Sequence, residues 1–177
     1  IILSQPQAPA APQQSAAPVP SQQAAELAAL ELKYQEDPSN VTNAFTLASS
    51  YFSLKRTNEG FRVLQALIEN TNASAQAVLS VAKAYSDLGY VGGLERAFTR
   101  ATEVLPESPE TWYDLARVQL VVNKKEAALT NLARAVQLSN ERVARDPNAF
   151  DIVKNARTNR SFDPLRNERQ FKALVGP

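Results

Sequence analysis

The sequence has 177 residues, of which 44% are hydrophobic, and this is enough to bury a core in one domain. The 19 basic and 18 acidic residues are mixed along the chain, which argues against a nucleic-acid partner because such proteins gather Lys and Arg into patches. There is no cysteine and no histidine. This composition excludes disulfides, thiolate nucleophiles, zinc sites built on Cys or His, and imidazole-based catalytic triads.

Residues 1–20 differ in composition from the rest, because Pro, Ala, Gln and Ser dominate them and no charge occurs. Such a segment cannot bury enough apolar surface to offset the entropy of ordering, so it predicts a disordered tether. The sequence opens on Ile1-Ile2-Leu3 without a methionine. Two interpretations remain open: the remnant of a membrane anchor or signal peptide, which would place the protein on the periplasmic side of a membrane, or a fragment boundary in a cytoplasmic protein.

A helical pattern begins at Ser21, which is a suitable N-cap residue. Leu27, Leu30 and Tyr34 recur at three- and four-residue spacing, as on one face of a helix. Asp37-Pro38 then ends the pattern. Residues 21–40 are therefore predicted to form one helix, half of a repeat, that docks on the structure following it.

An internal repeat occupies residues 41–142. The sequence divides without gaps into three segments of equal length, 41–74, 75–108 and 109–142. Apolar and small residues return to the same places in each segment, and Pro or Asn marks each boundary. The apolar sets are Leu47, Val81 and Leu115, and Leu64, Phe98 and Leu132. The small set is Ala48, Ala82 and Ala116, and the boundary residues are Pro38, Asn72, Pro106 and Asn140. A period of about 34 residues is typical of stacked helical hairpins.

The repeats resemble the tetratricopeptide repeat in sequence. The third segment carries Trp112, Leu115, Ala116, Ala128, Leu132 and Ala135, and the second carries Ala82, Tyr85, Gly89, Phe98, Ala101 and Pro106, at the places of that family's signature. Gly60, Leu67 and Gln119 depart from the signature. The resemblance implies an all-α fold, a right-handed α-solenoid of stacked helix-turn-helix repeats.

Each repeat is predicted to form two helices, for example Pro109 to Val122 and Lys124 to about Arg145. Residues 143–177 are predicted to form a C-terminal capping segment. Its tail, from Phe162 to Leu174, resembles the closing segment that follows the last repeat in many bacterial tetratricopeptide proteins. Within this cap we expect one helix from Ala149 to Thr158, with Phe150, Ile152 and Val153 directed at the last repeat. We expect a second helix to begin at Asp163-Pro164, with Asp163 as its N-cap.

The functional residues are predicted on the first helix of each repeat, opposite the packing stripe. The resemblance implies that these faces line a concave groove that receives a peptide or a partner helix. The candidate groove residues are Phe45, Ser49, Phe52, Leu79, Lys83, Asp87, Tyr113, Arg117 and Leu120. Their apolar members form a larger stripe than a solvated surface tolerates. The alternative is that the capping helix buries them.

These predictions favour a protein–protein interaction scaffold with an apolar groove. Members of the family that clamp a C-terminal carboxylate use Lys, Arg and Asn, whereas the matching positions here are Phe45, Ser49, Ser80, Glu110 and Asp114, so an acidic tail is a poor ligand. The alternative is an architectural subunit of a larger membrane or envelope complex. No set of residues supplies a base, a nucleophile and an oxyanion donor together, so we expect no enzyme activity, cofactor, metal or small-molecule substrate.

Overall fold

The computed structural model describes residues 21–176, and all its regular elements there are helical. In chain order they are α1 (Ser21–Glu36), α2 (Val41–Ser53), α3 (Thr57–Glu69), α4 (Ala75–Asp87), α5 (Val91–Val104), α6 (Pro109–Val121), α7 (Lys125–Arg145), α8 (Ile152–Thr158), the 3-10 helix η1 (Arg160–Leu165) and α9 (Arg169–Val175). The predicted tether, residues 1–20, lies outside the described residues.

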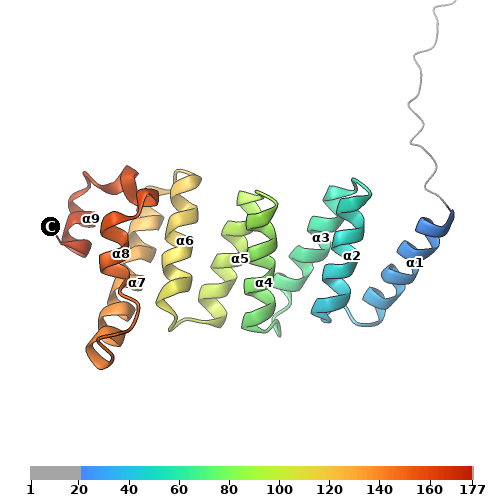
Figure 1. Cartoon of the computed structure of the whole chain (residues 1–177), viewed down its shortest axis with the longest axis horizontal. Coiled ribbons are helices and arrows are strands. Elements are labelled where there is room, and N and C mark those ends of the chain that lie inside the picture. The colour runs from blue at the N-terminus through green and yellow to red at the C-terminus, as the bar shows by residue number, and fades with distance from the viewer. Residues whose placement is uncertain (1–20, 177) are drawn as a thin grey trace, which may run out of the picture.

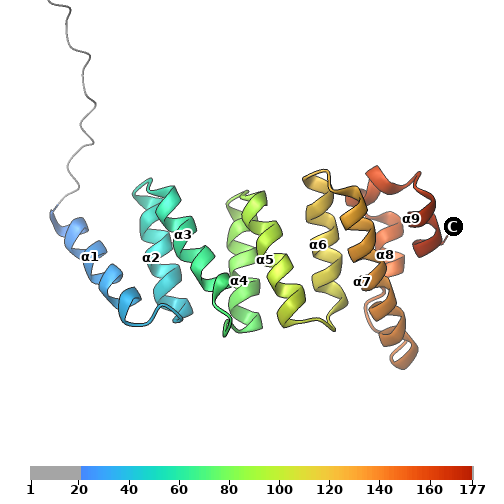
Figure 2. The same ribbon diagram turned by 180° about the vertical axis from the view of Figure 1, so that it is seen from behind.

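The helices stand side by side in one row, with α1 at one end and α9 at the other (Figures 1 and 2). Through α7, each helix packs mainly against its neighbours in sequence. The hairpins α2–α3, α4–α5 and α6–α7 begin at Val41, Ala75 and Pro109, the first residues of the three predicted segments. This arrangement confirms the predicted all-α solenoid of stacked helix-turn-helix units.

The turn inside each hairpin has the same geometry. Lys55, Gly89 and Asn123 follow the first helix of their repeats, and all three have positive φ angles of 62°, 67° and 59°. The next residue donates its N–H back to the carbonyl five residues earlier, for example Tyr90 to Tyr85 at 2.8 Å. This left-handed closure caps the last turn of the first helix and sends the chain into the second helix.

Small residues set how closely the helices approach. Ala97 and Ala101 on α5 and Ala116 on α6 are fully buried. A larger side chain at these places would push the helix axes apart, because interior packing leaves no spare volume. Between the first two hairpins, aromatic rings fill the space instead, and the rings of Phe61 and Tyr90 stack with centroids 4.2 Å apart.

The C-terminal segment closes the solenoid by burying its own apolar side chains. Ile152 on α8, Phe162 and Leu165 on η1, and Phe171 and Val175 on α9 are all buried in one cluster with α6 and α7. Ser139 on α7 is also buried, and its hydroxyl accepts the backbone N–H of Ile152 at 3.1 Å. This bond fixes where α8 begins on α7.

Two details of the predicted cap are wrong. The first cap helix begins at Ile152 and not at Ala149, because the Asp151 carboxylate caps it by accepting the N–H of Lys154 at 3.1 Å. Phe150 therefore precedes the helix and stays 52% exposed. Asp163 and Pro164 lie inside η1, whose first turn is capped by Asn159, and the last helix begins only at Arg169.

Candidate partner-binding groove

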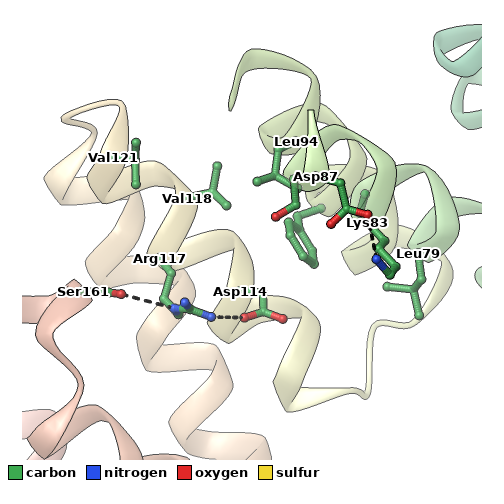
Figure 3. A pocket seen from close by; sticks show the side chains of 12 residues that line it. Leu79, Lys83, Asp87, Leu94, Asp114, Arg117, Val118, Val121 and Ser161 are labelled. Carbon is green, nitrogen blue, oxygen red and sulfur yellow. Dashed lines mark hydrogen bonds and ion pairs between the residues drawn. The ribbon is translucent and has the colours of Figure 1, made fainter. Parts of the chain in front are cut away.

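A groove of about 460 Å³ lies between α4 and α6, the first helices of the second and third repeats (Figure 3). Leu94 and Phe98 of α5 line it together with Val118 of α6. Leu79 on α4 is 38% exposed and Val121 on α6 is 70% exposed, although both are large aliphatic residues. We call this surface the α4/α6 groove.

Two ion pairs lie on the walls of the α4/α6 groove (Figure 3). The Lys83 ammonium lies 2.6 Å from the Asp87 carboxylate one turn along α4, and both side chains are largely exposed. On α6 the Arg117 guanidinium contacts Asp114 at 2.9 Å. Burial raises the pKa of Asp114, and the neighbouring Arg117 opposes this shift. The groove therefore carries paired charges on both walls and no net charge.

The capping segment also reaches the α4/α6 groove. Ser161 of η1 lines it, and the Arg117 Nε atom lies 3.5 Å from the Ser161 hydroxyl oxygen (Figure 3). The cap consequently forms part of the wall on the α6 side. Helical periodicity could not have indicated this residue, because Ser161 comes from a part of the chain outside the repeats.

A second hollow lies on the other side of α4, against α2, and we call it the α2/α4 hollow. It measures about 590 Å³, and Phe45 lies in it among Thr42, Thr46 and Ser80. Lys83 and Asp87 line this hollow as well as the α4/α6 groove. The exposed ion pair on α4 is therefore a ridge between two neighbouring hollows.

Six of the nine predicted groove residues lie in these surfaces. Leu79, Lys83, Asp87 and Arg117 line the α4/α6 groove. Phe45 lies in the α2/α4 hollow and also lines a shallow depression along α2 with the exposed Ser49. These six residues are divided among the α4/α6 groove, the α2/α4 hollow and the shallow depression along α2.

Tyr113 is the clearest correction, because it is not a free groove residue. Its side chain is only 5% exposed and its ring lies 5.2 Å from that of Phe162. The Tyr113 hydroxyl donates to Asn155 Oδ1 and accepts from Asn159 Nδ2 at 3.0 Å. For this residue the alternative prediction holds: the capping segment covers it.

Phe52 and Leu120 also lie in packing positions. The Phe52 ring packs edge-on against Phe61 at 5.2 Å and is half-buried between the helices of the first hairpin. Leu120 is half-buried against the cluster formed by α6, α7 and the cap. Val121, the next residue after Leu120, is the exposed one. A shift of one residue turns a helical position by about 100°, which separates the buried side chain from the exposed one.

The described residues contain no group of three or more potential metal ligands. None of the helices between residues 21 and 176 has the length and apolar character needed to span a membrane.

Comparison with known proteins gives distant structural neighbours. No protein-family model matches the sequence, and no curated protein matches it significantly. A crystal structure of MamA is 13% identical, with 86% of this chain and 84% of that chain covered and a TM-score of 0.49. The structure MamA MSR-1 C2 is 19% identical over 69% of this chain and 70% of its own, with a TM-score of 0.43. The MamA RS-1 ArsTM double mutant is 14% identical over 70% of each chain, with a TM-score of 0.45.

Proposed function

We propose that the protein is an interaction scaffold that holds a segment of a partner polypeptide in the α4/α6 groove. The exposure of Leu79 and Val121 on opposite walls of one hollow carries this proposal. A single exposed aliphatic residue is ordinary on a protein surface, but two that share a hollow with further apolar side chains offer a surface on which a partner can bury apolar groups.

The expected affinity comes mainly from these apolar groups. Full burial of an exposed large aliphatic side chain contributes about 1.5–3 kcal/mol. Leu79 and Val121 expose only 38% and 70% of their surface, so covering both contributes about 1.5–3 kcal/mol together. The ion pairs Lys83–Asp87 and Arg117–Asp114 are compensated within the protein. A partner therefore does not have to supply a counter-charge, and the pairs at the edge are expected to contribute orientation more than affinity.

The test uses random peptides displayed on phage and selected on the full chain. Selected peptides are labelled, and their dissociation constants are measured by fluorescence anisotropy for the wild type and for Leu79→Ser/Val121→Ser. The double substitution should weaken binding by about tenfold or more, since the two anchors together contribute about 1.5–3 kcal/mol.

Leu88→Ser is the matched control, because Leu88 is also a large exposed hydrophobic residue but does not line the groove. It should leave the dissociation constants unchanged. Thermal melts of all three proteins separate lost binding from lost folding. Peptides that bind the double variant as tightly as the wild type would contradict the proposal.

A further inference from the structure

We infer that the partner segment is extended and uncharged, and that it has two anchors: an aliphatic side chain in the α4/α6 groove and an aromatic one beside Phe45 in the α2/α4 hollow. The inference rests on the proposed function and specifies the ligand. Its basis is the position of the two hollows on either side of α4, with Lys83 and Asp87 shared between them.

The two hollows differ in chemistry. The apolar lining of the α4/α6 groove is mainly aliphatic, with Leu79 and Val121 on two helices and one aromatic ring, Phe98, on α5. The α2/α4 hollow has one large aromatic residue, Phe45, surrounded by hydroxyl groups. A flat ring in the ligand packs well against Phe45, because aromatic pairs gain energy beyond the area that they bury. A branched aliphatic side chain suits the other compartment.

A hydroxyl group beside Phe45 favours a hydrogen-bond donor in the ligand. The Thr46 hydroxyl donates its proton to the carbonyl of Thr42 at 2.8 Å. With its proton used, this oxygen can only accept a further bond. The backbone N–H groups of an extended peptide are donors of this kind, whereas those of a helix are used within the helix.

The ion pairs favour an uncharged ligand. Lys83 and Asp87 satisfy each other across 2.6 Å at the crossing point, and Arg117 and Asp114 do so at 2.9 Å on the far wall. A charged ligand residue beside either ion pair would be repelled by the like charge of the pair about as strongly as it is attracted by the opposite charge. Complementarity is therefore best for a segment with polar but uncharged residues between its anchors.

The width of α4 sets the spacing of the anchors. A helix with its side chains is about 10–12 Å across. An extended chain advances about 3.3 Å per residue and alternates its side chains between two faces. Two anchors that enter the same surface of this protein are therefore four positions apart. A partner helix is itself about 10–12 Å wide and would rest on the Lys83–Asp87 ridge without filling both hollows.

The test uses peptides of about twelve residues, long enough to cross both hollows, selected from the displayed library on the full chain. Binders should share an aliphatic and an aromatic residue separated by four positions, in an uncharged context. Replacement of either anchor by Ala should weaken binding by about tenfold or more, measured by anisotropy.

Two protein variants test the second compartment. Phe45→Leu keeps an apolar side chain but removes the ring. Replacement of the ligand's aromatic anchor by Ala should therefore weaken binding to this variant much less than binding to the wild type. Thr46→Val removes an acceptor while keeping the shape, and should weaken wild-type binders by about fivefold. Melts establish that both variants are folded, and Thr46 is exposed, so its replacement is expected to leave the fold intact.

The outcomes separate this inference from the proposed function. Binders that depend on Leu79 and Val121 but not on Phe45 would overturn the second anchor and leave the function standing. Anchors seven positions apart, the repeat of one helical face, would overturn the extended conformation alone. If no selected peptide lost affinity for Leu79→Ser/Val121→Ser, both the proposed function and this inference would be contradicted.

Discussion

The ring of Phe52 on α2 covers Gly60 on α3 so closely that a Cβ atom on Gly60 would lie 2.5 Å from Phe52 Cε1. The ring cannot easily withdraw, because its edge also packs against Phe61 with centroids 5.2 Å apart. The departure from the repeat signature at Gly60 thus has a local explanation, because glycine on α3 leaves room for the Phe52 ring on α2.

Gly60→Ala should lower the free energy of unfolding by about 1–3 kcal/mol, since the added methyl group overpacks the contact with Phe52. Gly92→Ala is the control, because nothing lies within 4 Å of a Cβ atom built there. That variant should be as stable as the wild type or slightly more so. Denaturant melts followed by circular dichroism measure both, and equal midpoints for the two variants would contradict the packing argument.

Lys55→Gly should stabilise the protein. Lys55 has a φ of 62°, a conformation that costs residues with a Cβ atom about 1 kcal/mol or more and costs glycine almost nothing. The equivalent turns use Gly89 and Asn123, both residue types that adopt it readily. We expect a gain of about 0.5–1 kcal/mol in thermal melts, with a comparable loss for the reciprocal Gly89→Lys. A lower melting temperature for Lys55→Gly would show that the turn is not strained.

The sequence was sufficient to predict the solenoid because each hairpin depends on short-range signals. Asn40 and Ser74 cap α2 and α4 as such residues commonly do, accepting the N–H groups of Asn43 and Ala77. The small residues Ala82 and Ala116 are buried as their period indicates. The cap was less predictable, because Asp163-Pro164 suits the start of an α-helix, whereas here both residues lie inside a 3-10 helix that Asn159 caps.

The candidate groove was predicted only in part, for a different physical reason. Helical periodicity gives the direction of a side chain and not what covers it. Leu79 and Tyr113 both point away from the repeat stripe, yet Leu79 stays partly exposed while Phe162 of the cap covers Tyr113. Contacts between residues far apart in sequence, such as Tyr113 with Asn155 and Asn159, decide which outcome occurs.

Substitutions of Tyr113 should therefore affect the fold and not only the groove. Tyr113→Phe removes a hydroxyl bonded to two cap amides and should cost about 1–2 kcal/mol. Tyr113→Ser also leaves a cavity beside Phe162 and should cost about 3–5 kcal/mol. Leu79→Ser, at a partly exposed position, should cost clearly less in the same melts. If Tyr113→Ser melted like the wild type, the cap would not be docked on α6 in solution.

Asp114→Asn should stabilise the protein at neutral pH. Burial raises the pKa of Asp114 above its unfolded value, with Arg117 opposing the shift and Glu110 adding to it. A raised carboxyl pKa means that the folded state holds the proton more tightly than the unfolded state, so stability falls as pH rises from the unfolded pKa through the folded pKa. Above that window the ionised carboxylate destabilises the fold, and below it the penalty is absent. Asparagine avoids the penalty and keeps an oxygen that can accept from Arg117.

The gain from Asp114→Asn should stay below about 1 kcal/mol, because the carboxylate is partly exposed and water screens it. Melting temperatures of the variant and the wild type, measured from pH 3 to pH 8, should coincide at the acidic end and separate as Asp114 ionises. Glu103→Gln on α5, melted over the same pH range, controls for the loss of one acidic charge from an ion pair along a helix, here with Arg100. A variant that is less stable at pH 7 and equal at pH 3 would mean that the ion pair with Arg117 outweighs the cost of burial.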